Sequence, residues 1–279
     1  DNTIGFINMI GSTIALLGNN TLTSDILMSA GLLRLGGSNQ FNGTLTNNGG
    51  EVRLESDTGL VSSTGGYTVY TDGTFNLNGF STTVAKITGT GTVTNNGSTS
   101  STLTVNASDS FTFSGKITDG LVSLGGISLV KNGSGILTLA STSNSYSGPT
   151  VINDGGIRVL QLGFGGQSSR IGNSSNDAAN LVFNGGSLRL LNISSTFTDR
   201  SFTLGVGDSA GAIIADGTLI GATVTFGFNG LTPDVAFMGS GSRTLTLGGA
   251  NRGDNLFNLQ LGDGSGGATS INKIGNGTW

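Results

Sequence analysis

Three neighbouring carboxylates are the residues of this chain best suited to catalysis. Glu51, Glu55 and Asp57 form its only acidic cluster, and the two glutamates would share one face of an extended strand with Arg53. Two carboxylates that face one cleft are the arrangement with which enzymes hydrolyse glycosidic bonds. The same residues fit a solvated strand face, and we favour that interpretation over catalysis.

Other catalytic and metal-binding chemistry lacks its usual residues. The 279 residues include no His and no Cys, which removes the Ser-His-Asp and Cys-His systems and the common zinc sites. The segment Gly262–Gly267 is superficially similar to a calcium-binding nonapeptide, but it does not repeat, so we interpret it as a turn. We therefore predict no enzyme activity, no catalytic, cofactor-binding or metal residues, and no cofactor.

Three further motifs are weak indications of a binding or modification site. Arg252-Gly253-Asp254 spells the tripeptide that integrins read, but Gly-Asp pairs are frequent here and an ordinary turn explains it. Most aromatic residues are expected to stack inward, although Tyr67 and Tyr70 could belong to an outward ladder that binds glycans or a neighbouring rod. Asn-x-Ser/Thr sequons, which a chain so rich in these residues produces by chance, occur at Asn42, Asn96, Asn106, Asn132, Asn173, Asn192 and Asn276.

The composition excludes several partners. Only 10% of the residues are charged, the net charge is −4, and the 12 basic residues are scattered singly. Nucleic acids and anionic lipids need clustered Lys and Arg, so neither is an expected partner. Disorder is disfavoured as well, because hydrophobic residues still make up 35% of the chain and the net charge is low.

Strict alternation of apolar and polar residues predicts strands almost everywhere, because successive side chains of a strand point to opposite faces. No window carries a helical period, so we expect little or no helix. The alternation is clearest in Leu33–Leu35, Val52–Leu54, Thr74–Leu77, Thr102–Val105, Phe111–Phe113, Ile136–Leu139, Leu188–Leu190, Val224–Phe226 and Leu245–Leu247.

Asn-Gly, Asp-Gly and Gly-Gly pairs lie between the strands, and such pairs taken alone predict β-hairpins. A repeat argues against hairpins. Gly31–Leu35 aligns with Gly135–Leu139, and the glycine turns that follow, Asn48–Gly50 and Asp154–Gly156, align as well. Repeats of this size indicate stacked turns of roughly 20–25 residues. We therefore predict an all-β fold, a right-handed parallel β-helix (β-solenoid) of roughly a dozen turns spaced about 4.8 Å apart.

No domain boundary is visible, so we expect residues 1–279 to form a single continuous β-solenoid segment, part of a longer repeat protein. The best repeat cores are 129–160 and 271–279, the second an incomplete copy. Ile4–Leu17 is read as one or two strands because it is interrupted and too short to span a membrane. Leu160–Asn180 is the most loop-like region and is expected to bulge from the rod.

The residues from Leu129 to Leu160 resemble the autotransporter-associated β-strand repeat of bacterial passenger domains. The matching residues are Lys131–Leu139, Tyr146–Gly148, Thr150-Val151 and Gly155–Ile157, and Lys273–Trp279 is similar to the start of another copy. The resemblance implies a right-handed β-helix, export, and an extracellular or bacterial cell-surface location. It implies no particular activity and brings no functional residues.

Together these features favour a structural or adhesive extracellular rod that forms part of a cell-surface layer, fibre or adhesin. Self-association into fibres or layers and a glycan or cell-surface partner are both left open. Two alternatives remain at this stage, namely a β-helix enzyme that acts on polysaccharide through Glu51, Glu55 and Asp57, and a segment of a phage or viral fibre.

Overall fold

The computed structural model describes residues 2–62, 66–120, 125–191, 193–227 and 235–279. Its described residues form 29 strands and one short 3-10 helix, Ala178–Asn180. The chain divides into two compact units, residues 1–130 and 131–279. The prediction of one continuous segment stays a prediction.

The first unit is a stack of parallel strands. One ladder joins β1 (Asn2–Ile4), β3 (Asn20–Leu22) and β5 (Asn39–Phe41), and another joins β10 (Thr82–Val84) to β13 (Ser101–Asn106). The long strand β4 (Ile26–Leu35) pairs with β2 (Ile7–Leu16) on one side. On its other side, the first half of β4 begins one ladder and the second half begins another. These ladders are β6 (Thr44–Asn47), β8 (Thr68–Thr71) and β11 (Lys86–Thr88), and β7 (Glu51–Leu54), β9 (Thr74–Asn76), β12 (Thr92–Thr94) and β15 (Lys116–Thr118). β14 (Phe111–Phe113) completes the unit, and β16 (Ile127–Asn132) leads out of it.

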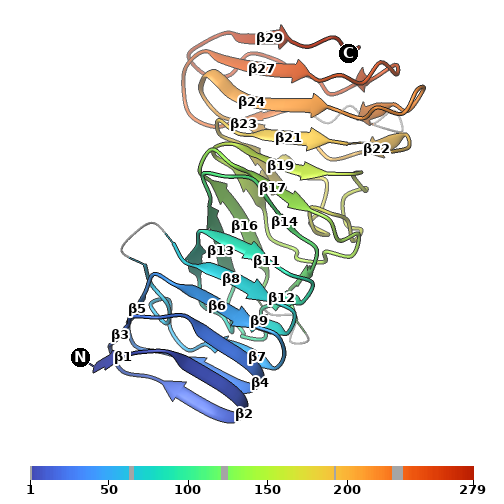
Figure 1. Ribbon diagram of the computed structural model, residues 1–279. Helices are drawn as coiled ribbons and strands as arrows, with labels where there is room; N and C mark the ends of the chain where they lie inside the picture. The colour runs from blue at the N-terminus through green and yellow to red at the C-terminus, as the bar shows by residue number, and fades with distance from the viewer. Residues whose placement is uncertain (1, 63–65, 121–124, 192, 228–234) are drawn as a thin grey trace. The chain divides into compact units, whose positions relative to one another are not determined.

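The second unit is built from three parallel ladders. The longest joins β17 (Ile136–Leu139), β19 (Gly156–Val159), β21 (Ser187–Leu190), β24 (Gly207–Ala215), β27 (Arg243–Gly248) and β29 (Thr269–Lys273). The second joins β18 (Thr150–Ile152), β20 (Leu181–Phe183), β23 (Thr203–Leu204) and β26 (Ala236–Phe237). The third joins β22 (Thr196–Thr198), β25 (Val224–Phe226) and β28 (Leu256–Phe257). In Figure 1, β21, β24, β27 and β29 lie one above another and point the same way.

Both units have the strand arrangement of a parallel β-helix, which confirms the predicted fold class. Every pairing described above is parallel, so the Asn-Gly pairs connect stacked strands rather than hairpins. Along these ladders, inward positions of one turn lie on their equivalents in the next, and most of these side chains are buried. One such column in the first unit contains Leu33, Val52, Phe75, Val93 and Ile117.

Some turns of the second unit are longer than the predicted 20–25 residues, although Leu137 lies on Ile157 and Leu188 on Ile213 within that range. Ile157 lies on Leu188 and Ile213 lies on Leu247, whereas in the first unit Leu33 lies on Val52. The extra residues form loops between strands. The longest loop without a strand runs from residue 160 to residue 177, in the region that the sequence predicts to bulge.

Lys131 of the repeat core hydrogen-bonds to the backbone of the turn that directly follows it. Lys131 is fully buried, and its Nζ donates to the carbonyl oxygens of Asn132 and Gly133, both at 2.6 Å. Lys273 makes the same pair of bonds, to Ile274 at 2.9 Å and Gly275 at 3.1 Å. Burial lowers the pKa of Lys131. The lysine thus satisfies carbonyl groups at a tight turn, a role that the sequence analysis did not assign.

No described helix is long and apolar enough to cross a membrane.

Candidate functional site

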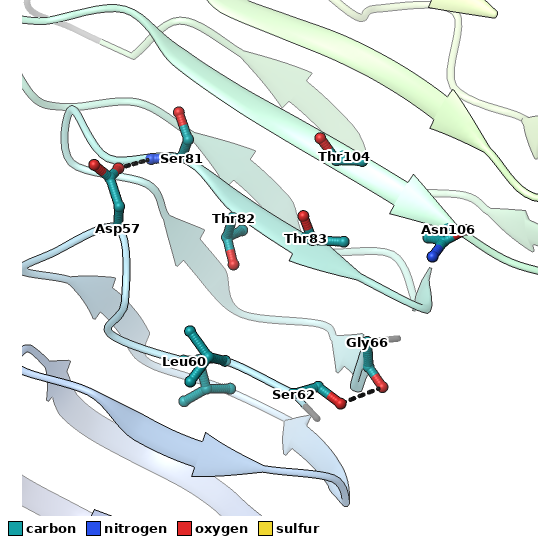
Figure 2. Close-up of a pocket in the computed structure, with 10 residues that line it drawn as sticks. Asp57, Leu60, Ser62, Gly66, Ser81, Thr82, Thr83, Thr104 and Asn106 are labelled. Carbon is teal, nitrogen blue, oxygen red and sulfur yellow. Dashed lines mark hydrogen bonds between the residues drawn. The ribbon is translucent and has the colours of Figure 1, made fainter. Parts of the chain in front are cut away.

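A hollow of about 460 Å³ on the first unit is lined by hydroxyl and amide side chains together with one carboxylate and an apolar patch (Figure 2). Its residues come from three successive parts of the coil, namely the segment after β7, strand β10 and strand β13. The lining consists of Asp57, Leu60, Val61, Ser62, Gly66, Ser81, Thr82, Thr83, Thr104 and Asn106. Positions 63–65 lie outside the described residues.

Backbone register brings the two strands of this hollow together. Thr83 of β10 pairs with Thr104 of β13, so their side chains are neighbours on one outward face. Asp57 lies beside the start of β10, where its Oδ1 accepts a hydrogen bond from the Ser81 amide at 2.6 Å. This bond ties one turn to the next and fixes the carboxylate at the edge of the hollow.

One wall of the hollow is fixed from inside the protein. The hydroxyl of Tyr67 lies 2.6 Å from Thr82 Oγ1, and both side chains are buried. Burial raises the pKa of Tyr67, so the phenol stays protonated at neutral pH. Tyr67 therefore points inward, as most aromatic residues are expected to do, and does not belong to the outward ladder that the sequence left open. The ring faces inward because Phe41 packs against it, with ring centroids 5.9 Å apart. Tyr70 is 37% exposed and donates its hydroxyl to Asp72.

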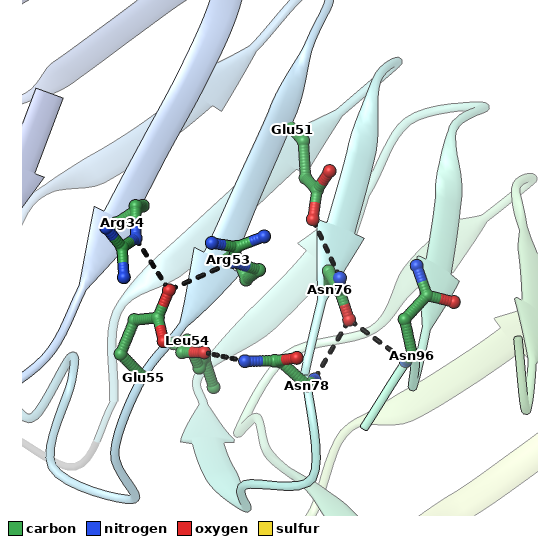
Figure 3. Close-up of polar contacts among 8 residues, drawn as sticks. All are labelled: Arg34, Glu51, Arg53, Leu54, Glu55, Asn76, Asn78 and Asn96. Atoms are coloured by element: carbon green, nitrogen blue, oxygen red, sulfur yellow. Dashed lines mark hydrogen bonds and ion pairs between the residues drawn. The ribbon is translucent and has the colours of Figure 1, made fainter. Parts of the chain in front are cut away.

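Of the two glutamates of the predicted acidic cluster, Glu51 lies on the outward face of β7 and Glu55 directly follows that strand, and the two belong to separate networks (Figure 3). Glu51 accepts a hydrogen bond from Asn76 at 2.7 Å, and Glu55 accepts from Arg34 at 2.8 Å and from Arg53 at 2.9 Å. Neither glutamate lines the hollow that contains Asp57. A glycosidase requires two carboxylates that face one cleft, and these three carboxylates do not converge in that way.

Glu55 bridges two like charges. Arg34 and Arg53 are direct partners in adjacent turns, an arrangement in which two guanidinium groups repel each other. A carboxylate between them relieves this repulsion. The bond from Arg34, together with that from Arg53, lowers the pKa of Glu55 against the opposing effect of burial. Arg158 and Arg189 stack in the same way in the second unit, where Arg189 pairs with Asp216.

The lowered pKa of Glu55 predicts a pH dependence of stability. Its contribution is complete above the ordinary pKa of 4.5 and is lost as the pH falls through the lower folded value. We expect the urea midpoint to fall more between about pH 5 and pH 3 in the native protein than in Glu55→Gln. Because these side chains are 21–36% exposed, the difference should stay within about 1 kcal/mol per pair. Parallel pH profiles for the two proteins would contradict this assignment.

The remaining motifs lie in the second unit. Arg252 and Asp254 are exposed, and Gly253 between them is buried against the neighbouring turn. Arg252 lines a second hollow, of about 470 Å³, together with Leu219 and Ile220. In Gly262–Gly267, Asp263 accepts a bond from the Thr269 amide, as a turn residue does. No described group of acidic residues could hold a metal ion.

The sequons differ in exposure. Asn132 and Asn173 are half-buried, and Asn192 lies outside the described residues. The exposed ones are Asn42, Asn96, Asn106 and Asn276.

Stacked parallel turns, inward apolar columns and glycine turns define a β-helical repeat protein. Residues 129–159 match the family model of the passenger-associated-transport-repeat. The chain is also 34% identical over 271 residues to the adhesin BmaC autotransporter of Brucella suis biovar 1 (strain 1330). That alignment covers 96% of this chain and 7% of the relative, so the chain spans a small part of the relative's length. No solved structure matches the chain.

These findings confirm the expectation of an autotransporter-type repeat protein. The matched segment 129–159 coincides with the predicted repeat core 129–160. In the structure it contains β17, β18 and β19, which belong to two different ladders of the second unit. The repeat is therefore a unit of the coil, as its periodicity predicted.

Proposed function

We propose that this chain is part of the extracellular passenger of an autotransporter and contributes an adhesive surface to the bacterial cell. The observation that carries the proposal is the 34% identity with an autotransporter adhesin over nearly the whole chain. The matched repeat and the parallel β-helix support it, because stacked coils of this kind present long, rigid surfaces. Self-association through these surfaces remains a prediction.

The chemistry of the acidic residues supports binding rather than catalysis. Glu55 is held ionised by two arginines, so it is poorly suited to act as a general acid. Glu51 and Asp57 hydrogen-bond to Asn76 and to the Ser81 amide, in different networks. We therefore propose a non-enzymatic protein that acts through its surface.

A bead assay tests the adhesive role. Beads that carry the purified chain should attach to cultured epithelial cells at least about tenfold more than beads that carry the heat-unfolded chain. Multivalent display is needed because single contacts of a rod are expected to be weak. Beads coated with an unrelated β-solenoid of similar charge control for charge and shape. Equal attachment of all three kinds of bead would overturn the proposal.

A further inference from the structure

We propose that the hollow around Asp57 binds one neutral saccharide unit, which would make it a glycan-contact site of the chain. This inference rests on the proposed adhesive function and specifies its ligand class. The hollow, at about 460 Å³, falls within the size range of small-ligand sites. Its lining includes hydroxyl side chains, one amide and one carboxylate, and these polar groups complement a ligand rich in hydroxyl groups.

Asp57 supplies the strongest acceptor of the site. Oδ1 is fixed by the Ser81 amide, so the orientation of the carboxylate is set before a ligand arrives. Oδ2 has no partner among the described residues. A carboxylate oriented in this way can accept bonds from two adjacent hydroxyl groups of a sugar ring, and such charge-assisted bonds are stronger than neutral ones.

Thr83 of β10 and Thr104 of β13 supply two hydroxyl groups to the hollow. They are partners in neighbouring turns and lie on the outward face, and neither hydroxyl bonds to a described residue. The adjacent Thr82 is different, because its hydroxyl is already used by Tyr67. A hydroxyl can donate and accept, so two of them suit the mixed polarity of sugar hydroxyl groups.

The rest of the wall favours a neutral sugar. Leu60 and Val61 provide an apolar patch against which the C–H face of a sugar ring can pack. No Lys or Arg is among the described residues that line the hollow, and Asp57 is the one charged residue among them. A carboxylated, sulfated or phosphorylated ligand would place a like charge beside Asp57 and would be rejected.

Matched sugars test the charge preference. The purified chain would be titrated with galactose, glucose and N-acetylglucosamine and with galacturonate and glucuronate, and binding followed by ligand-observed NMR. We expect at least one neutral sugar to bind, and its carboxylated counterpart to bind at least about tenfold more weakly. The proposal would be overturned if no neutral sugar bound, or if the acidic counterparts bound equally well.

Variants place the binding in the hollow. Asp57→Asn keeps the size and an acceptor for Ser81, and it should weaken neutral sugar about tenfold while abolishing the preference over the acid. Thr83→Val and Thr104→Val should each weaken binding about threefold to tenfold. Thr46→Val, on the outward face of β6 and outside the hollow, should leave affinity unchanged. Unchanged affinity in Asp57→Asn and Thr83→Val, with unchanged thermal melts, would refute the site.

The bead assay separates this inference from the proposed function. If the native chain attaches to cells and Asp57→Asn attaches equally well, adhesion stands and the saccharide site fails as its basis. If the chain binds neutral sugar but its beads do not attach, the site stands and the adhesive role fails.

Discussion

Replacing Gly249 with alanine should destabilise the last turns of the second unit by about 3 kcal/mol or more. Gly249 has a φ of 114°, a conformation that residues with a Cβ rarely adopt. A Cβ at this position would lie 2.0 Å from the carbonyl oxygen of Ala215 in the neighbouring turn. Backbone of an adjacent strand cannot move aside without breaking the ladder, so strain and collision add.

Two other glycines separate these effects. Gly221 has a φ of 81° with nothing within 4 Å of a built Cβ, so Gly221→Ala should cost only the backbone strain, about 1–2 kcal/mol. Gly262 also has open space and no positive φ, and Gly262→Ala should lie within about 0.5 kcal/mol of the native protein.

Trp279 reports the outcome. It is the only tryptophan, and its Nε1 donates to the carbonyl oxygen of Gly248 at 2.9 Å, so its fluorescence follows unfolding beside the mutated turn. Urea midpoints should fall in the order Gly262→Ala, Gly221→Ala, Gly249→Ala. If Gly249→Ala were no less stable than Gly221→Ala, the close approach of adjacent turns at this position would be disproved.

The coil itself could be predicted from the sequence because its signals are local. Alternation marks Leu33, Val52 and Phe75 as inward residues, and a shared period is enough to stack them. The period also distinguished stacked turns from hairpins, which Asn-Gly pairs alone would have favoured. The same alternation placed Glu51 and Arg53 on one outward face, and the structure confirms it.

The hollow could not be predicted because it depends on the length of each turn. Asp57, Thr83 and Thr104 come from three different turns, so their proximity depends on how those turns stack on one another. Turn length does not follow from alternation, because loops between strands vary freely. Tyr67 shows the same limit, since its inward position follows from its contact with Phe41 and Thr82 rather than from a local pattern.

Like charges at equivalent positions stack in successive turns of a parallel coil and repel one another, so a low content of charged residues suits this fold. Arg34 does stack on Arg53, but Glu55 lies between their guanidinium groups. A parallel coil therefore tolerates a charged column where one opposite charge is placed beside it. Buried cations are stabilised differently, because in the described structure their hydrogen bonds go to carbonyl oxygens and not to carboxylates.

Arg200 is the clearest of these cations, and Arg200→Met should destabilise the second unit by about 3–5 kcal/mol. Its side chain is 1% exposed. It donates to a hydroxyl and to carbonyl oxygens that all lie in the strandless loop of residues 160–177. These acceptors are the carbonyls of Gly163, Phe164, Gly172, Ser174 and Ser175 and the hydroxyl of Ser174. Methionine would fill much of the space but would leave these oxygens without their donor.

Matched variants decide whether the guanidinium group holds this loop against the coil. Arg200→Lys keeps the charge but has fewer donors and no planar fork, so it should fall between the native protein and Arg200→Met. Arg252→Met controls for loss of an exposed arginine and should change stability by less than about 0.5 kcal/mol. Hydrogen exchange should show the amides of residues 163–176 losing protection in Arg200→Met before the strands do. If those amides kept their protection and the urea midpoint did not move, the loop would be held by its own contacts and not by Arg200.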